Sequence, residues 1–219
     1  MLRIKKENVI LEYTLDQLIN ANIYLGYHKK FLNESMFKYL SGIRSHIILI
    51  NLSYTLILLK QSCNFIQHIF YNFGFIWLID WFKNKHISIL WHELGNLDKN
   101  ECRLYIWNHF WYAGIITNFF HVFKSTKIDW KNINFPNILF FFNTTKFMKA
   151  INEPIKTKIP FVSIIDSNSN SNLAIYTIPG NEKSIASLFF YYKIFFKFIL
   201  RLNILEKVYF FLAIRKLIK

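Results

Sequence analysis

The sequence has few glycines and no glycine-rich loop. Its six glycines are Gly26, Gly42, Gly74, Gly95, Gly114 and Gly180, and no two of them stand close together. The G-x-G-x-x-G fingerprint of dinucleotide-binding proteins, the phosphate-binding P-loop and the G-x-S-x-G nucleophile elbow all need closely spaced glycines. None of these motifs occurs, so the sequence argues against the enzyme classes that depend on them.

Cysteine is also scarce. Cys63 and Cys102 lie far apart and form no C-x-x-C pair, so we interpret both as reduced thiols in the core. His92 and Glu93 begin an H-E-x-x-H zinc motif, but Asn96 replaces its second histidine. The other histidines lack ligand spacing, so the sequence predicts no metal site and no cofactor.

Acidic residues are few. The chain of 219 residues has 13 Asp and Glu against 27 Lys and Arg, which gives a formal net charge of +14 and an isoelectric point near 9.7. Such a charge implies a polyanionic partner, either a nucleic acid or an anionic membrane surface.

Long uncharged runs are present, but polar residues interrupt them. Residues 61–79 and 104–122 contain no Lys, Arg, Asp or Glu over about the length of a membrane span. Each run holds several Asn, Gln or His side chains, and unpaired polar groups are costly at bilayer depth. We therefore expect no spanning helix. The first twelve residues contain Glu7 and Glu12 and no long apolar run. A signal peptide needs such a run and transit peptides are poor in acidic residues, so neither is evident.

Aromatic residues are abundant, at 19% of the chain, and 24 of them are phenylalanine. Lysine far outnumbers arginine, and asparagine and isoleucine are also frequent. Enrichment in these residues together is typical of AT-rich, compact organelle genomes. We therefore attribute part of the hydrophobicity to codon composition rather than to burial.

Apolar patterns along the chain alternate between strand and helix type. We expect strands at residues 47–50, 75–79, 105–107, 137–142 and 159–165, and helices at 11–21, 53–70, 119–123, 144–157 and from about 182. Ser53 is the expected cap of its helix, and Pro154 is expected to interrupt another. Because the strands read as buried on both faces, the pattern predicts a parallel α/β sheet.

Such sheets bind ligands beyond the carboxyl ends of their strands, where Asp80 and Asp166 lie. A nucleotide-binding α/β enzyme that has lost its glycine-rich loop is therefore the alternative function. A lone aspartate followed by Ser167 and Asn168 is more often a turn cap than a catalyst. We expect the protein not to be an enzyme.

One stretch carries a motif for which we find no catalytic role. It contains Asn108, His109, Trp111, Gly114, Thr117 and Asn118 in fixed spacing. It resembles the signature of the ribosomal protein S2 family of the small subunit, Asn-His-Arg-Trp-Leu-Gly-Gly-x-Leu-Thr-Asn. Phe110 and Ala113 depart from that signature. Trp111 is either a core anchor or an RNA-facing side chain.

Two further blocks, in the same order as in the family, strengthen the resemblance. The first keeps the family spacing at Gly26, Asn33, Met36, Gly42, Arg44, Asn51, Leu52 and Thr55, but loses the family's residues at Tyr24, Tyr27, Leu32 and Glu34. The last keeps Ile159, Pro160, Ile164, Asp166, Asn168 and the run Ile178-Pro179-Gly180-Asn181. The resemblance covers about residues 15–186.

The resemblance implies a flavodoxin-like parallel sheet flanked by helices, forming an S2-like domain over residues 1–186. The family inserts a charged helical hairpin, but only residues 123–135 are present here, so we expect that hairpin to be missing. Residues 187–219 form an extra, basic and aromatic helical tail. In that tail Lys193, Lys197 and Arg201 recur at i, i+4 and i+8, which predicts one basic stripe on a helix.

The resemblance also implies a function: a structural constituent of the small ribosomal subunit that binds its rRNA and neighbouring ribosomal proteins, with no small-molecule substrate. The expected RNA contacts are Lys29, Lys30, Asn33, Lys38 and Arg44 in the first loop, and Asn108, His109, Trp111, Thr117 and Asn118 in the signature. The drifted composition favours the ribosome of the mitochondrial matrix, with the plastid ribosome as second choice.

The tail is expected to leave the main domain. A helix that is hydrophobic around most of its girth must bury that surface, and a sheet already flanked by helices has little room. We therefore expect residues 189–212 to dock on a neighbouring ribosomal protein with the stripe toward rRNA. A weaker alternative is that Lys207, Arg215, Lys216 and Lys219 touch the anionic inner membrane.

Overall fold

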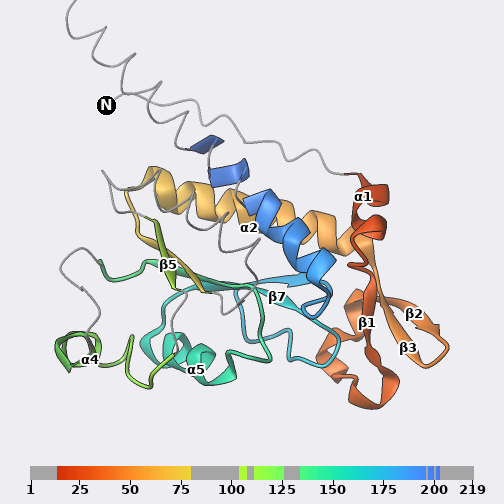
Figure 1. Ribbon diagram of the computed structural model, residues 1–219, viewed down its shortest axis with the longest axis horizontal. Coiled ribbons are helices and arrows are strands. Elements are labelled where there is room, and N and C mark those ends of the chain that lie inside the picture. Colours follow the sequence, from red (N-terminus) through yellow and green to blue (C-terminus); the bar gives the residue numbers. More distant parts are fainter. Residues whose placement is uncertain are drawn as a thin grey trace, which may run out of the picture.

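A computed structural model of the chain describes residues 14–79, 104–107, 111–125, 134–195, 197–199 and 201–202. These residues form a five-stranded parallel sheet with helices on both faces and a three-stranded antiparallel sheet at one end (Figure 1). None of the described helices is long and apolar enough to cross a membrane.

The parallel sheet contains the apolar runs that the sequence predicts as strands. It consists of β4 (Ile76–Ile79), β5 (Leu104–Trp107), β6 (Ile138–Phe141), β7 (Phe161–Ile165) and β8 (Tyr176–Pro179), in the order β5-β4-β6-β7-β8. β4 is the first of these strands in the chain, so the order is the 2-1-3-4-5 of flavodoxin-like folds. Every residue of β4, β6 and β7 is buried, as expected for a sheet covered on both faces.

Helices cover the two faces of this sheet (Figure 1). One face packs against α2 (Leu52–Tyr71) and a C-terminal helix formed by residues 185–195, 197–199 and 201–202. The other packs against α4 (Phe119–Ser125) and α5 (Met148–Thr157). Strand side chains alternate between the faces, so Leu78 joins the first cluster and Trp77 the second.

The antiparallel sheet was not predicted. β1 (Leu25–His28), β2 (Leu40–Arg44) and β3 (Ile47–Ile50) form it in the order β1-β3-β2, and the short α1 (Leu15–Asn20) precedes it. β3 has the predicted bounds but does not pair with the parallel sheet. Ser45 and His46 have positive φ of 48° and 65°, as in the two-residue turns of tight hairpins. Neither residue is the Gly or Asn that such turns usually contain, so no local sequence signal marks this hairpin.

Two predicted helix details are wrong. Asn51, not Ser53, caps α2, because its side-chain oxygen accepts the Ser53 N–H at 3.0 Å. Pro154 does not interrupt α5, which continues to Thr157. The helix ends at Lys158, whose left-handed φ of 58° is a common helix terminus.

The C-terminal helix packs into the core instead of leaving the domain. Its side chains Leu188, Tyr191, Tyr192, Ile194, Phe195, Phe198, Ile199 and Leu202 are buried in the same cluster as α2. The Phe195 ring lies 4.2 Å from that of Phe140 on β6, centroid to centroid. We expected the flanking helices to leave no room for this segment on the sheet. That expectation was wrong, because the C-terminal helix itself covers the side chains of β6 on this face. The chain beyond residue 202 lies outside the described residues.

Candidate nucleic-acid interface

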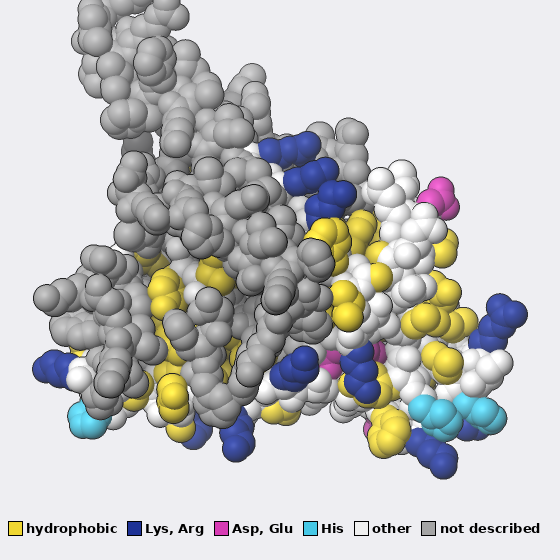
Figure 2. Space-filling model, in the orientation of Figure 1, with side chains coloured by type: hydrophobic (Ala, Val, Ile, Leu, Met, Phe, Trp, Pro, Cys, Tyr) yellow, Lys and Arg dark blue, Asp and Glu magenta, His cyan; other side chains and the backbone are white. Residues whose placement is uncertain are grey.

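Basic side chains meet at the outer end of the antiparallel sheet. Lys29 and Lys30 are exposed in the short 3-10 helix η1 (Lys29–Phe31), and Arg44 is exposed at the end of β2. The Lys29 N–H donates to the His46 carbonyl at 2.8 Å, which joins η1 to the β2–β3 turn. His28 stacks on His46 with ring centroids 5.6 Å apart. We call these five residues the tip cluster; Figure 2 shows His, Lys and Arg side chains gathered there.

Two other predicted contacts lie close by in sequence. Lys38 is exposed in the 3-10 helix η2 (Glu34–Tyr39), with its Nζ 4.9 Å from the Tyr39 ring centroid. Asn33 is only half-buried, and its side-chain oxygen accepts the Ser35 N–H at 3.0 Å and the Ser35 hydroxyl at 2.8 Å. The Asn33 side chain therefore caps η2, and its contact with RNA stays a prediction.

Ser167, at the carboxyl end of β7, holds this loop against the parallel sheet. Its Oγ accepts the Tyr27 N–H at 2.8 Å, and its carbonyl accepts the Asn33 N–H at 2.9 Å. A Cβ on Gly26 would lie only 2.7 Å from that Oγ. The shared family glycine is thus explained by a close approach of two chain segments.

Asp166 orients Ser167. Its Oδ1 accepts the Ser167 N–H at 2.6 Å and the Ser167 hydroxyl at 3.1 Å. Burial, together with the nearby Glu182 charge, raises the pKa of Asp166 to about 7, although its hydrogen bonds act in the opposite direction. The side chain is a buried turn cap, as the sequence indicates, and it supports the loop that carries the tip cluster.

The Ile-Pro-Gly-Asn run positions the C-terminal helix. A Cβ on Gly180 would overlap the Tyr191 hydroxyl, so glycine is what lets the helix approach this closely. The Asn181 side-chain oxygen accepts the N–H groups of Lys183 and Ser184 at 2.9 and 3.0 Å, which orders the turn just before the helix. These contacts bind the helix to the family-like domain.

Two buried glutamates were missed by sequence reasoning. Glu182 is fully buried, and its carboxylate accepts the Thr144 N–H and hydroxyl, both at 2.8 Å, and the Thr145 hydroxyl at 2.6 Å. It fixes the turn before α5. Glu153 is buried on α5, three residues after the buried Ala150. An acid on the apolar side of an amphipathic helix was the signal that could have revealed it.

Glu153 holds the signature stretch. Its carboxylate accepts four N–H groups: the Trp111 indole at 3.0 Å and the backbones of Gly114, Ile116 and Thr117 at 2.9, 2.8 and 3.2 Å. Gly114 has a φ of +97°, which suits glycine. The signature's tryptophan and glycine are therefore explained by the attachment of this loop to α5.

The signature residues divide between the core and the surface. Trp111 is buried, with its ring 5.5 Å from that of Trp107, so it is a core anchor. The side chains of Thr117 and Asn118 are exposed, and the Asn118 carbonyl accepts the Val122 N–H at 3.1 Å in the first turn of α4. Asn108 and His109 lie outside the described residues.

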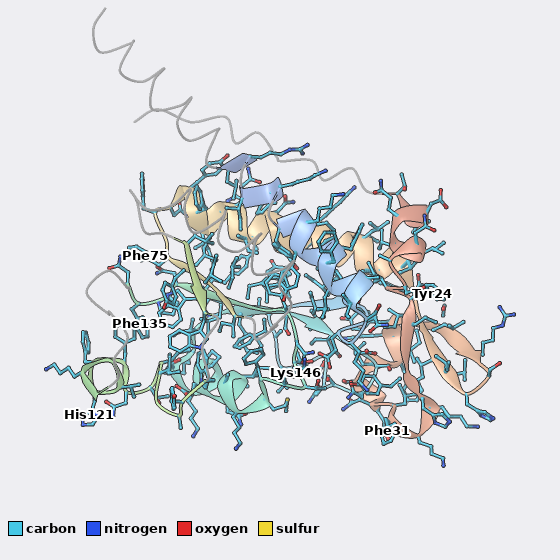
Figure 3. The ribbon with its side chains drawn as sticks, viewed as in Figure 1. Tyr24, Phe31, Phe75, His121, Phe135 and Lys146 are labelled. Atoms are coloured by element: carbon cyan, nitrogen blue, oxygen red, sulfur yellow. The ribbon has the colours of Figure 1, made fainter. Side chains whose placement is uncertain are left out.

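The two predicted sets of contacts lie on separate surfaces. Figure 3 places Phe31 at the outer end of the antiparallel sheet and His121 of α4 at the opposite end of the molecule. The structure brings together Lys29, Lys30 and Arg44 but keeps them away from the exposed part of the signature.

This fold and site define a class: a basic α/β protein of flavodoxin-like topology whose buried carboxylates hold loops in place. The chain belongs to the ribosomal protein S2 family, whose family model matches it over residues 18–134 and 129–201.

Several relatives bear names of small-subunit proteins. The chain is 31% identical to small ribosomal subunit protein uS2m of Acanthamoeba castellanii, a mitochondrial-type member, over 85% of this chain and 58% of that protein. It is 26% identical to uS2 of Granulibacter bethesdensis, over 82% of this chain and 81% of the relative. For uS2 of Gluconobacter oxydans the identity is 25%, over 82% and 79%. The chain thus spans less than two thirds of the Acanthamoeba relative's length.

Proposed function

We propose that this protein is a structural constituent of the small subunit of a mitochondrial ribosome, and that it binds the rRNA and neighbouring ribosomal proteins there. The observation that carries this proposal is the tip cluster, whose basic side chains are exposed. Ser167, packed closely against Gly26, holds their loop against the parallel sheet. Both the family relationship and the net charge of +14 support the proposal.

The tip cluster suits an RNA backbone. Lysine and arginine neutralise phosphates and release counterions, which supplies affinity without reading sequence. Phe31, with 63% of its surface exposed beside Lys30, offers a ring on which an unpaired base can stack. Double-stranded rRNA would be bound by its shape across the minor groove.

Neighbouring ribosomal proteins are the second class of partner. Phe37 and Ile43, in η2 and β2, are exposed over 61% and 53% of their surface. Large apolar side chains that stay exposed on a folded surface are typical of protein contacts. In this proposal the tip cluster contacts RNA, and Phe37 and Ile43 contact protein.

The proposed role includes no reaction. Asp166, the described acid at a strand end, accepts the Ser167 N–H and hydroxyl with its Oδ1, so it acts as a turn cap and not as the catalytic acid that a nucleotide-binding enzyme would need here. The mitochondrial matrix is the proposed location, with the plastid ribosome as second choice. A peripheral membrane contact through the tail would depend on Lys207, Arg215, Lys216 and Lys219, outside the described residues.

Sedimentation tests the proposed role. Lysate of the purified organelle is separated on a sucrose gradient, and the protein is located by mass spectrometry together with small-subunit rRNA. We expect the protein to peak with the small subunit and to shift to the top of the gradient after RNase treatment. Its recovery only with membranes, or only in fractions of low mass, would contradict the proposal.

A further inference from the structure

One face of the C-terminal helix carries a regular row of exposed side chains. Ile185, Phe189, Lys193, Lys197 and Arg201 follow one another at intervals of four residues, and all five are exposed. Side chains four apart lie on the same face of a helix, with a rise of about 6 Å per step. The first two positions are apolar and the last three, which we call the basic row, are cationic.

The orientation of this row is fixed by the core. On the opposite side of the helix, Tyr191, Phe195, Phe198 and Leu202 are almost completely buried. The Phe195 ring packs against Phe140 and, edge to face, against Phe142. The helix cannot rotate without exposing these rings, so the basic row must face outward.

Neither of the two described helices on this face carries an acidic side chain near the row. The sequence contains no Asp or Glu between residues 183 and 205, and none in α2, the other helix on this face. Lys60 and His68 of α2 are exposed. Figure 2 shows a line of Lys and Arg side chains over the C-terminal helix. Such a surface attracts a polyanion.

We propose that the basic row is a second RNA contact, separate from the tip cluster. This inference rests on the proposed function, because it takes RNA to be the partner. Lys193, Lys197 and Arg201 would neutralise neighbouring phosphates along one strand, while Phe189 packs on a sugar or base at its end. An amphipathic helix binds a membrane through its apolar face, and here that face is turned into the protein.

The test uses the full chain and an in vitro transcript of the small-subunit rRNA, with affinity measured over a range of salt concentrations. The row variant is Lys193→Gln/Lys197→Gln. The slope of log K against log salt is negative, and each lost phosphate contact reduces its magnitude by about 0.7–0.9, so we expect the row variant's slope to be smaller in magnitude by about 1.5. The matched control is Lys149→Gln/Lys156→Gln on α5, which removes the same charge from exposed positions on the other face. We expect its slope to stay at the wild-type value.

A second variant tests the apolar end of the row. Phe189→Ala removes a ring but no charge, so we expect a weaker affinity for the transcript with an unchanged slope. Circular dichroism and thermal melting identical to wild type would establish that both variants are folded.

The possible failures can be told apart. If the tip variant, Lys29→Ala/Lys30→Ala/Arg44→Ala, loses slope while the row variant keeps it, the row is not an RNA contact but the proposed function stands. If neither variant loses slope, both ideas fail. If the row variant binds the transcript normally but loses binding to vesicles of phosphatidylcholine and phosphatidylserine, the row is a membrane contact and the inference is overturned.

Discussion

The carboxylate of Glu153 accepts the indole N–H of Trp111 at 3.0 Å, across 42 positions of the chain. The same side chain also accepts three backbone N–H groups of the signature loop. A single glutamate on α5 thus holds the stretch by which the sequence resembles its family. Part of that signature is therefore a structural attachment, and only its exposed residues remain available for a partner.

The first prediction concerns this attachment. In Glu153→Gln, one of the two acceptor oxygens becomes an NH₂ group, so two of the four N–H groups lose their acceptor. A buried unpaired donor costs about 1–3 kcal/mol, and we expect the free energy of unfolding to fall by about 3 kcal/mol. Urea denaturation of wild type and variant measures this change. Glu34→Gln, at an exposed acid, is the control, and an equal effect of the two substitutions would contradict the assigned role.

The second prediction concerns the contact between the two sheets. The added Cβ of Gly26→Ala would meet the Ser167 Oγ at 2.7 Å and the Ile48 carbonyl at 3.2 Å, and we expect a loss of about 1–3 kcal/mol of unfolding free energy. Ser167→Gly removes the nearest atom as well as the hydrogen bond from Tyr27.

Because both substitutions act on the same contact, we expect the double variant to lose less stability than the sum of the single variants. Chemical denaturation of all four proteins completes the cycle. Strict additivity would show that Gly26 and Ser167 do not depend on each other.

The third prediction concerns pH. The pKa of Asp166 is raised from an ordinary value of about 4 to about 7 by burial and by the charge of Glu182. Between these values the folded protein holds a proton that the unfolded chain releases. The stabilisation from this group is therefore complete below about pH 4 and is lost as the pH rises through about 7.

Asp166→Asn removes this titration but can keep an oxygen that accepts the Ser167 N–H. We expect the wild-type protein to lose stability relative to the variant as the pH rises from 4 to 7. Thermal melting at a series of pH values tests this. A difference between the two proteins that does not vary with pH would rule out Asp166 as the titrating group.

The sequence predicts the parallel sheet because its strands are apolar on both faces. A continuous apolar run such as that of β4 or β7 is typical of a strand covered on both faces, so it can be identified from local composition without knowing which strands lie next to it. The antiparallel sheet escaped prediction because Ser45 and His46 adopt left-handed backbone without the usual Gly or Asn. Strand pairing in that sheet is decided by the fold rather than by a local motif.

The site is less predictable than the fold. Exposed lysines such as Lys29 can be proposed from the sequence, since charge and family spacing point to them. The glutamates that hold the loops are harder to find. Glu153 stands on the apolar side of an amphipathic helix, which is a local signal, but no local pattern marks Glu182, whose partner Thr144 lies 38 positions away. The C-terminal helix was wrongly placed for a similar reason, since its packing partners, Phe140 and Phe142, lie far away in sequence.

The salt dependence of rRNA binding tests the central claim, that the tip cluster holds RNA. In the variant Lys29→Ala/Lys30→Ala/Arg44→Ala we expect weaker binding of a small-subunit rRNA transcript. The negative slope of log K against log salt should become smaller in magnitude by about 0.7–0.9 per phosphate contact, or about 2 to 3 in all. Lys149→Ala/Lys156→Ala on α5 is expected to leave the slope unchanged. A tip variant that folds normally and keeps the wild-type slope would contradict the account.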